Sequence, residues 1–229
     1  TPDKLKEAKT FDLSFAIALD KNSKLKRLER EESVIYTYLP TSFRFGSEGF
    51  PFLVNANFIT DAGRQQLHKD SEWNKLIFSK IPSEFLLWIK EISSAYRNYW
   101  EVLPEKSYGR SNALETIYAE NMEKAISEIA FIPSLKNGMD KLLASEAFMD
   151  RMSISDSISI DALVCHINRT YTRTFDANNQ IENVWKGSRI LNSYGVFIFD
   201  KQKLKSLFED ECAFESIIPE FNAKLIKFL

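Results

Sequence analysis

The sequence predicts an α+β protein, in which a mixed β-sheet with helices on one face precedes a mainly helical region with a few short strands. Strict alternation of apolar and polar residues over 11–19 is typical of a half-buried strand. Runs rich in β-branched and aromatic residues at 33–41 and 51–59 indicate two more strands. Apolar residues then recur at helical spacing over 85–100 and 114–129, which indicates amphipathic helices.

The first strand is expected over 10–20. Its alternation places five apolar side chains on one face: Phe11, Leu13, Phe15, Ile17 and Leu19. The segment 21–32 balances basic against acidic residues and is expected to be a solvated loop. Because this link is too short for a crossover helix, the sheet is expected to be antiparallel in part.

Helices are expected directly after the third strand. Thr60 is suited to cap one helix, and Asp70 or Ser71 to cap the next. Pro82 is expected at the start of a further, long amphipathic helix, because proline fits the first helical turn. The aromatic stripe of that helix is expected to be core.

A polar, irregular stretch at 103–112 is expected to separate two domains, 1–104 and 105–229. Just after it, Asn112 and Glu115 fit a capping box at the start of a helix.

Within the second domain, alternation over 169–175 predicts an edge strand, and the apolar run 194–200 predicts a short buried strand. Two helices, the last of them over 218–229, are expected to close the chain.

Composition places the chain among ordinary globular proteins, with 44% hydrophobic and 27% charged residues and a formal net charge of −2. The balanced charge disfavours nucleic acid as a partner. The two cysteines form no CxxC pair, which indicates a reduced, cytoplasmic protein. No apolar run is long enough for a membrane span, so no membrane partner is expected. Both ends look cut, so a fragment of a longer protein is expected.

Several common active sites are excluded by counting. No two glycines are separated by a single residue, which excludes a dinucleotide-binding GxGxxG motif, and no phosphate loop is present. Cys165 and His166 are adjacent on an expected helix and point about 100° apart, so they do not form a nucleophilic pair. No metal site is predicted, and the chain is not expected to be an enzyme by itself.

The stretch VNANFITDAGRQQLHKDSEWNKLIFSKI, residues 54–81, resembles the middle segment of the sacsin-type relatives of the ninety-kilodalton heat-shock chaperones. The upstream YTYLPTS and GFPFLVNANF segments resemble the same proteins. The chaperone motif reads Asn-x-Ser-Arg-Glu-x-Leu-Gln. Arg64 falls on its arginine and Leu67 on its leucine, whereas Gly63 and His68 replace its serine and glutamine.

The resemblance implies a role in a GHKL-type ATPase. In that superfamily ATP binds to a separate N-terminal domain, and the following domain supplies a basic residue to the γ-phosphate. Arg64 would be that catalytic and ATP-contacting residue, with His68 and Lys69 as secondary candidates on the same stretch. The fragment itself would hold no cofactor, whereas ATP and Mg²⁺ are implied for the full-length protein. Its partner would be the N-terminal ATP-binding domain of the same chain; a protein client and an oligomer are left open.

Two alternatives stay open at this point. Arg64 could form an ordinary surface ion pair with Asp61, Asp70 or Glu72. The chain could also be a non-catalytic protein- or nucleic-acid-interaction module of a large multidomain bacterial protein. In that case a basic and aromatic segment would serve as the contact: Arg169, Tyr171 and Arg173.

Overall fold

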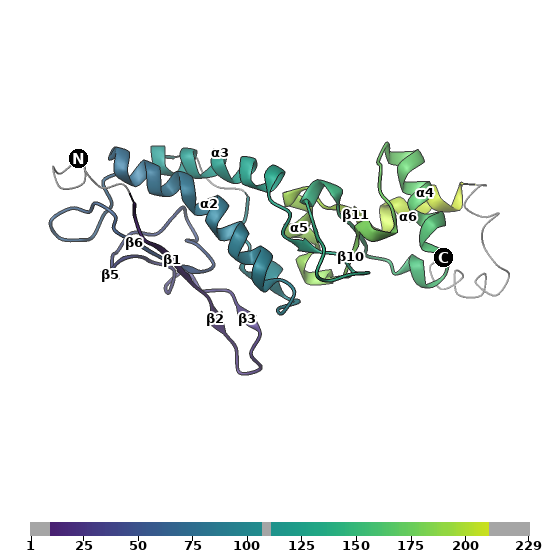
Figure 1. The fold of residues 1–229 in the computed structure, drawn as a ribbon, viewed down its shortest axis with the longest axis horizontal. Helices are drawn as coiled ribbons and strands as arrows, with labels where there is room; N and C mark the ends of the chain where they lie inside the picture. The colour runs from purple at the N-terminus through teal and green to yellow at the C-terminus, as the bar shows by residue number, and fades with distance from the viewer. Residues whose placement is uncertain (1–9, 107–110, 211–229) are drawn as a thin grey trace. The chain divides into compact units, whose positions relative to one another are not determined.

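The computed structural model describes residues 10–106 and 111–210, and it divides the chain into two compact units between Ile129 and Ala130. Both units combine helices with small sheets (Figure 1), so the predicted α+β class is confirmed. In the described residues, no helix has both the length and the apolar character that a membrane crossing requires.

The sheet of the first unit has four strands in the order β1-β6-β4-β5. β1 (Leu13–Ala16) pairs antiparallel with β6 (Leu53–Ala56), and β6 pairs parallel with β4 (Ile35–Thr37). β5 (Leu39–Pro40) returns antiparallel to β4. The sheet is therefore mixed, as predicted, and β1 forms one of its edges.

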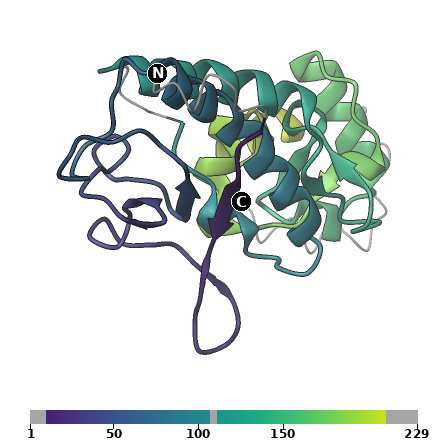
Figure 2. The same ribbon diagram turned by 60° about the vertical axis from the view of Figure 1, so that its left-hand side comes forward.

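A hairpin follows β1, in which β2 (Ala18–Leu19) pairs antiparallel with β3 (Leu25–Lys26). Its turn and β3 belong to the charged segment that was expected to be a loop. The hairpin, in purple, projects away from the sheet in both views (Figures 1 and 2). Asp20 closes its turn, because Oδ1 accepts the N–H of Lys24 at 2.9 Å and that of Asn22 at 2.8 Å. These hydrogen bonds lower the pKa of the Asp20 carboxyl below its ordinary value of 3.8, and the bond from the N–H of Lys24 has the largest effect.

One helix, α2 (Glu72–Ile92), replaces the two that the sequence predicts around Pro82. Ser71 caps it by accepting the N–H of Asn74, which confirms one of the two predicted caps. The prediction of a new helix at Pro82 is wrong, because proline lies inside α2. The buried face continues unbroken on both sides of Pro82, from Phe78 to Phe85, and this packing outweighs the missing hydrogen bond.

Stacked aromatic rings form the core of the first unit. Phe52, which directly precedes β6, stacks on Phe85 of α2 with ring centroids 4.0 Å apart. Phe50 stacks on Phe52 at 5.2 Å and on Phe45 at 4.4 Å. Tyr118 extends the cluster, with its ring 4.7 Å from that of Phe45.

Tyr118 belongs to α3 (Ala113–Glu128), which runs beside α2 (Figures 1 and 2). Asn112 caps α3 as predicted, with Oδ1 accepting the N–H of Glu115 at 3.1 Å. Because α3 packs into the aromatic core, it belongs to the first unit. The boundary expected between 104 and 105 therefore lies inside that unit, and the division follows α3 instead.

The second unit begins with a hairpin of β7 (Ile132–Pro133) and β8 (Lys141–Leu142). Its central sheet has three parallel strands in the order β10-β9-β11: β9 (Phe148–Asp150), β10 (Gln180–Ile181) and β11 (Phe197–Phe199). The helices are α4 (Ile160–Tyr171), α5 (Ser188–Tyr194) and α6 (Lys201–Phe208).

Two predictions for this unit have different outcomes. The short buried strand expected within 194–200 is confirmed by β11, whose residues are all buried. The edge strand expected over 169–175 is wrong, because its first residues complete α4 and Thr172 ends that helix in a left-handed conformation with φ 52. The helix expected at 218–229 lies outside the described residues.

Gly49 is expected to be the least replaceable glycine of the first unit. Its φ is +75, and a Cβ there would lie 2.1 Å from Oγ of buried Ser33. Gly49→Ala should therefore lower the free energy of unfolding by about 2–5 kcal/mol. Urea denaturation followed by circular dichroism measures this change.

Gly46→Ala is the matched control, because Gly46 also has a positive φ of +63 but its Cβ would meet nothing within 4 Å. Its free energy of unfolding should fall only by the cost of placing alanine in the left-handed conformation, about 1–2 kcal/mol. Equal losses in the two variants would show that contact with Ser33 is unimportant.

Candidate functional site

Residues 60–67 form a braced loop, which we call the Arg64 loop. Thr60 and Leu67 pair in an isolated antiparallel bridge, and the N–H of Asp61 donates to the carbonyl of Gln66 at 3.0 Å. The N–H of Arg64 donates to the carbonyl of Asp61 at 3.0 Å and closes a turn. The helix expected after Thr60 is therefore wrong, because the backbone groups of this segment pair across the loop instead.

Asn74 holds both arms of the Arg64 loop on α2. Its side chain is fully buried, and its Oδ1 accepts the N–H of Ile59 at 2.8 Å. Its Nδ2 donates to the carbonyls of Ile59 at 2.8 Å and His68 at 2.9 Å. One side chain of the helix thus satisfies three backbone groups at the base of the loop, which fixes where the loop begins and ends.

Arg64 lies near the tip of this loop, exposed to solvent, with a left-handed φ of 54. This conformation is unfavourable for a residue other than glycine by about 1–2 kcal/mol. The neighbouring Gly63 has no positive φ, so the left-handed conformation is adopted by the arginine and not by the glycine. Strained backbone of this kind is concentrated at functional sites.

The ion pairs considered for Arg64 are not formed. Oδ1 of Asp61 accepts the N–H of Gln65 at 2.7 Å, and Glu72 binds Nζ of Lys75 at 2.7 Å. The latter hydrogen bond raises the pKa of Lys75 above its ordinary value of 10.5. Within residues 10–106 and 111–210, the guanidinium of Arg64 has no hydrogen-bond or ion-pair partner, Asp70 included.

His68 and Lys69 are exposed and lie at the base of the loop, just before Ser71 caps α2. The backbone of His68 is fixed by its N–H bond to the carbonyl of Ile59 at 3.1 Å. In the described part of the chain, no hydrogen bond or ring contact joins the side chains of Arg64, His68 and Lys69. The structure therefore places Arg64 on the loop and His68 and Lys69 just after it, with no bond that joins the three side chains into one site.

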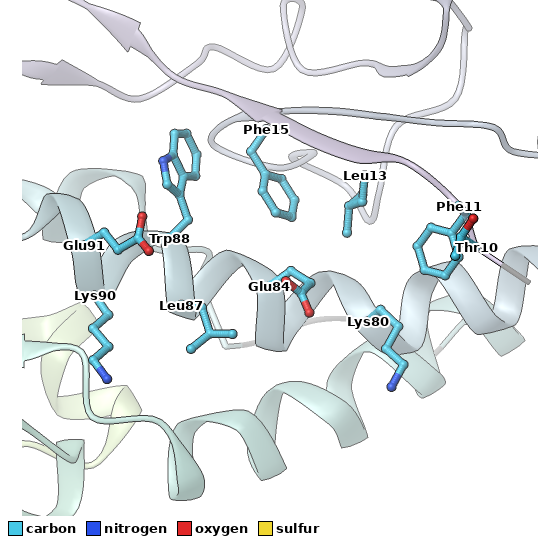
Figure 3. A pocket seen from close by; sticks show the side chains of 10 residues that line it. All are labelled: Thr10, Phe11, Leu13, Phe15, Lys80, Glu84, Leu87, Trp88, Lys90 and Glu91. Carbon is cyan, nitrogen blue, oxygen red and sulfur yellow. The ribbon is translucent and has the colours of Figure 1, made fainter.

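An open groove that the sequence analysis missed lies between β1 and α2 (Figure 3). Its volume is about 850 Å³, and Phe11, Leu13 and Phe15 of the β1 segment point into it toward the helix. Leu87 of α2 borders it and is 43% exposed. The apolar residues of both walls were visible in the sequence, as alternation in the β1 segment and as helical spacing in α2. These patterns do not show that β1 is the edge of the sheet, which is why the groove was not predicted.

A second missed cluster joins α4 to the end of α6 in the second unit. Nδ1 of buried His166 lies 2.7 Å from Oδ2 of Asp210, and its Nε2 lies 3.2 Å from Oγ of Ser206. Arg169 also pairs with Asp210. No local sequence signal reveals this cluster, because its parts come from separate helices.

The cluster has the carboxylate–imidazole–hydroxyl order of serine hydrolases but lacks other features of such a site. Oγ of Ser206 donates to the carbonyl of Lys203 at 2.7 Å and also contacts the hydroxyl of Tyr171 at 2.9 Å. Ser206 lies inside α6, where its own N–H bonds within the helix and is not free to bind an oxyanion. We therefore interpret the cluster as a structural link between α4 and α6.

The same contacts bear on the basic and aromatic segment considered for nucleic acid. Arg169 pairs with Asp210, and the hydroxyl of Tyr171 bonds to Ser206. Arg173 lies over the ring of Phe197, 5.6 Å from its centroid. All three side chains thus have contacts inside the unit, which disfavours a nucleic-acid role for them.

Metal ligands are not grouped in the part of the chain that the structure describes: no three His, Cys, Asp or Glu residues are placed to hold an ion. Comparison with protein-family models, with curated proteins and with solved structures gives no match for this chain. The resemblance to sacsin-type chaperones therefore stays a prediction.

Asn74→Ala should loosen the Arg64 loop, because it leaves the N–H of Ile59 without its acceptor and removes one of the two hydrogen bonds at each of the carbonyls of Ile59 and His68. We expect a loss of about 2–4 kcal/mol in the free energy of unfolding. Amide hydrogen exchange at His68 should accelerate beyond this global change. Asn121→Ala removes a bond within α3 only, Nδ2 to the carbonyl of Ile117 at 2.8 Å, and should change neither measurement appreciably. Unchanged exchange at His68 in Asn74→Ala would contradict the bracing role.

Proposed function

We propose that the first unit is a coupling segment of a chaperone-like ATPase. In this proposal, Arg64 contacts the γ-phosphate of ATP held by an N-terminal domain of the same protein. The unit then transmits the nucleotide state to later parts of the chain. Two observations support this function together: the sequence resemblance, and the exposed guanidinium of Arg64, which has no partner among the residues that the structure describes.

The state of Arg64 is the observation that carries the proposal. A surface arginine with nearby carboxylates commonly pairs with one of them, yet Asp61 and Glu72 are engaged elsewhere. The loop holds the arginine in a strained conformation and is anchored by Asn74 on a long helix. An anchored cation of this kind suits a phosphate group, because the planar guanidinium fork matches phosphate oxygens.

The described residues fit a phosphate contact and not a complete nucleotide site. Arg64, and at the loop base Lys69, offer cationic donors, whereas no carboxylate cluster in the described residues would hold Mg²⁺. ATP and Mg²⁺ would therefore be bound by the N-terminal domain. ATP supplies the phosphoryl group, and the part of this chain is to stabilise charge on it from outside that domain.

Arg64→Ala in a protein that includes the N-terminal domain should lower ATP turnover about 100-fold or more, while ATP binding changes little. The reason is that the residue would act on charge that develops at the γ-phosphate. Steady-state phosphate release measures turnover, and equilibrium titration with a fluorescent nucleotide measures binding. Turnover within twofold of the wild type would overturn the proposal.

Arg64→Gly separates function from folding. Glycine accepts the left-handed conformation, so stability should stay constant or rise by about 1 kcal/mol while turnover falls as in Arg64→Ala. Lys21→Ala is a control for removal of an exposed charge, since Lys21 lies in the turn of the β2–β3 hairpin. It should leave turnover unchanged.

A further inference from the structure

We propose that the parallel sheet of the second unit binds a small aromatic ligand at its carboxyl end, through an oxyanion of that ligand: a phosphate or a carboxylate group. Arg151 holds the oxyanion, and the exposed ring of Trp185 packs against the rest of the ligand. The site belongs to the second unit alone and uses neither Arg64 nor ATP, so it is independent of the proposed function.

The guanidinium of Arg151 has no acceptor among the described residues. Its Nε is buried and makes no hydrogen bond, and its terminal nitrogens have no hydrogen-bond or ion-pair partner there either. A guanidinium carries a permanent charge and five N–H donors, so removing part of it from water without an acceptor is unfavourable. Buried polar groups in proteins are nearly always paired, and a bound anion would supply the missing acceptor.

The side chain of Arg151 is held on the ring of Trp185. Its Cζ lies 3.7 Å from the centroid of that ring, which is the distance of a stacked cation–π pair. Because one face rests on the indole and Nε is covered, the two terminal nitrogens are the donors left for a ligand. They form a planar fork that matches two oxygens of a phosphate or a carboxylate.

The backbone of Arg151 is fixed as well. Its N–H donates to the carbonyl of Phe199 at 3.0 Å, and its carbonyl accepts Nδ2 of Asn183 at 3.1 Å. The loop that follows folds around the carboxylate of Asp150, which accepts the N–H of Ser155 at 2.7 Å. The cation is therefore preorganised, so a ligand that binds it loses little free energy to ordering the protein.

Arg151 and Trp185 both follow the carboxyl ends of parallel strands. Arg151 is the first residue after β9, and Trp185 follows β10, which ends at Ile181. The chain passes from β9 to β10 on one side and then to β11 on the other side, with a helix in each connection. In open α/β sheets, ligands bind outside the carboxyl ends of the strands where the strand order reverses in this way. The topology thus indicates the place of a site, whereas its chemistry follows from Arg151.

The charges at this end of the sheet favour an anion. The segments 151–155 and 183–189 contain no carboxylate and three basic residues: Arg151, Lys186 and Arg189. Asp150, just before the first segment, is buried, and its carboxylate binds N–H groups of its own loop. Asp156 and Glu182 also border these segments, and neither forms an ion pair with Arg151.

Trp185 supplies an apolar surface beside the cation. It is 66% exposed, and in the described residues it makes no ring contact with another aromatic side chain. Arg151 covers one face of the indole, so the other face stays open to a planar group. Tryptophan is enriched where ligands and partners bind, because its ring combines a large apolar area with a polar N–H. A ligand that joins an aromatic ring to an oxyanion would satisfy both side chains.

Titration of the 229-residue chain with phenyl phosphate and with benzoate tests the proposal, followed by NMR of the arginine Nε–H and indole N–H resonances. The resonances of Arg151 and Trp185 should shift saturably, with Kd of roughly 1 mM or less for the better ligand. The tighter of the two ligands identifies phosphate or carboxylate as the preferred group. Benzyl alcohol has the ring but no oxyanion and should bind at least about tenfold more weakly.

Arg151→Lys tests the fork, because lysine keeps the charge but lacks the planar pair of donors. It should raise Kd about fivefold or more, and Arg151→Ala at least about tenfold. Arg173→Ala is the matched control. Arg173 also lies over an aromatic ring, 5.6 Å from the centroid of Phe197, but Phe197 is at the amino end of β11. This variant should leave Kd within about twofold.

The proposal is overturned if neither anion shifts the resonances of Arg151 and Trp185, or if benzyl alcohol binds as tightly as the anions. It is also overturned if a folded Arg151→Lys binds both anions as tightly as the wild type. Equal weakening by Arg173→Ala would overturn it too, because binding would then follow overall charge and not the fork. Amide spectra establish that each variant is folded, and Arg151→Lys together with the wild-type titration decides the question if Arg151→Ala does not fold.

Discussion

The contact between Phe52 and Phe85 is the interaction on which the first unit depends. Their rings stack at 4.0 Å and fix the sheet against α2. Phe50 and Phe45 extend the stack toward Tyr118, so the same cluster also holds α3 in place. Aromatic side chains bury large apolar areas, and offset stacking adds about 0.5–1.5 kcal/mol per pair. The buried face of α2 thus sets the position of the helix, and its exposed residues are not needed for this packing.

Local patterns predicted the parts of this fold that local interactions determine. Alternation identified β1, whose burial alternates along the strand, and the Asn112 cap was found because its partner is only three residues away. The buried run that became β11 was also recognisable. In each case the observation that decides the structure lies within a few residues of the element itself.

The errors arose where distant contacts decide the outcome. The Arg64 loop looks like the start of a helix, yet Asn74, on the following helix, binds its two arms and favours a hairpin-like path. Pro82 looks like a helix start, yet the continuous buried face keeps α2 intact. The link from His166 to Asp210 spans 44 residues, so no local sequence pattern reveals it. For the candidate site, the sequence identified Arg64 but neither its strained backbone nor the groove.

The Arg64 loop and the groove beside β1 both depend on α2. Asn74 in its first turn positions the Arg64 loop, and Glu84 and Glu91 in its second half border the groove. Pro82 lies between them and removes one backbone N–H from the helix, so the carbonyl of Phe78 lacks its usual intrahelical partner. Such a position is where a helix bends most readily. The groove is lined mainly by the half of α2 that follows Pro82, whereas the loop is anchored to the half before it. The aromatic core contacts both halves, because Phe45 stacks on Phe78 before Pro82 and Phe52 stacks on Phe85 after it, so the buried face holds the helix together across the proline.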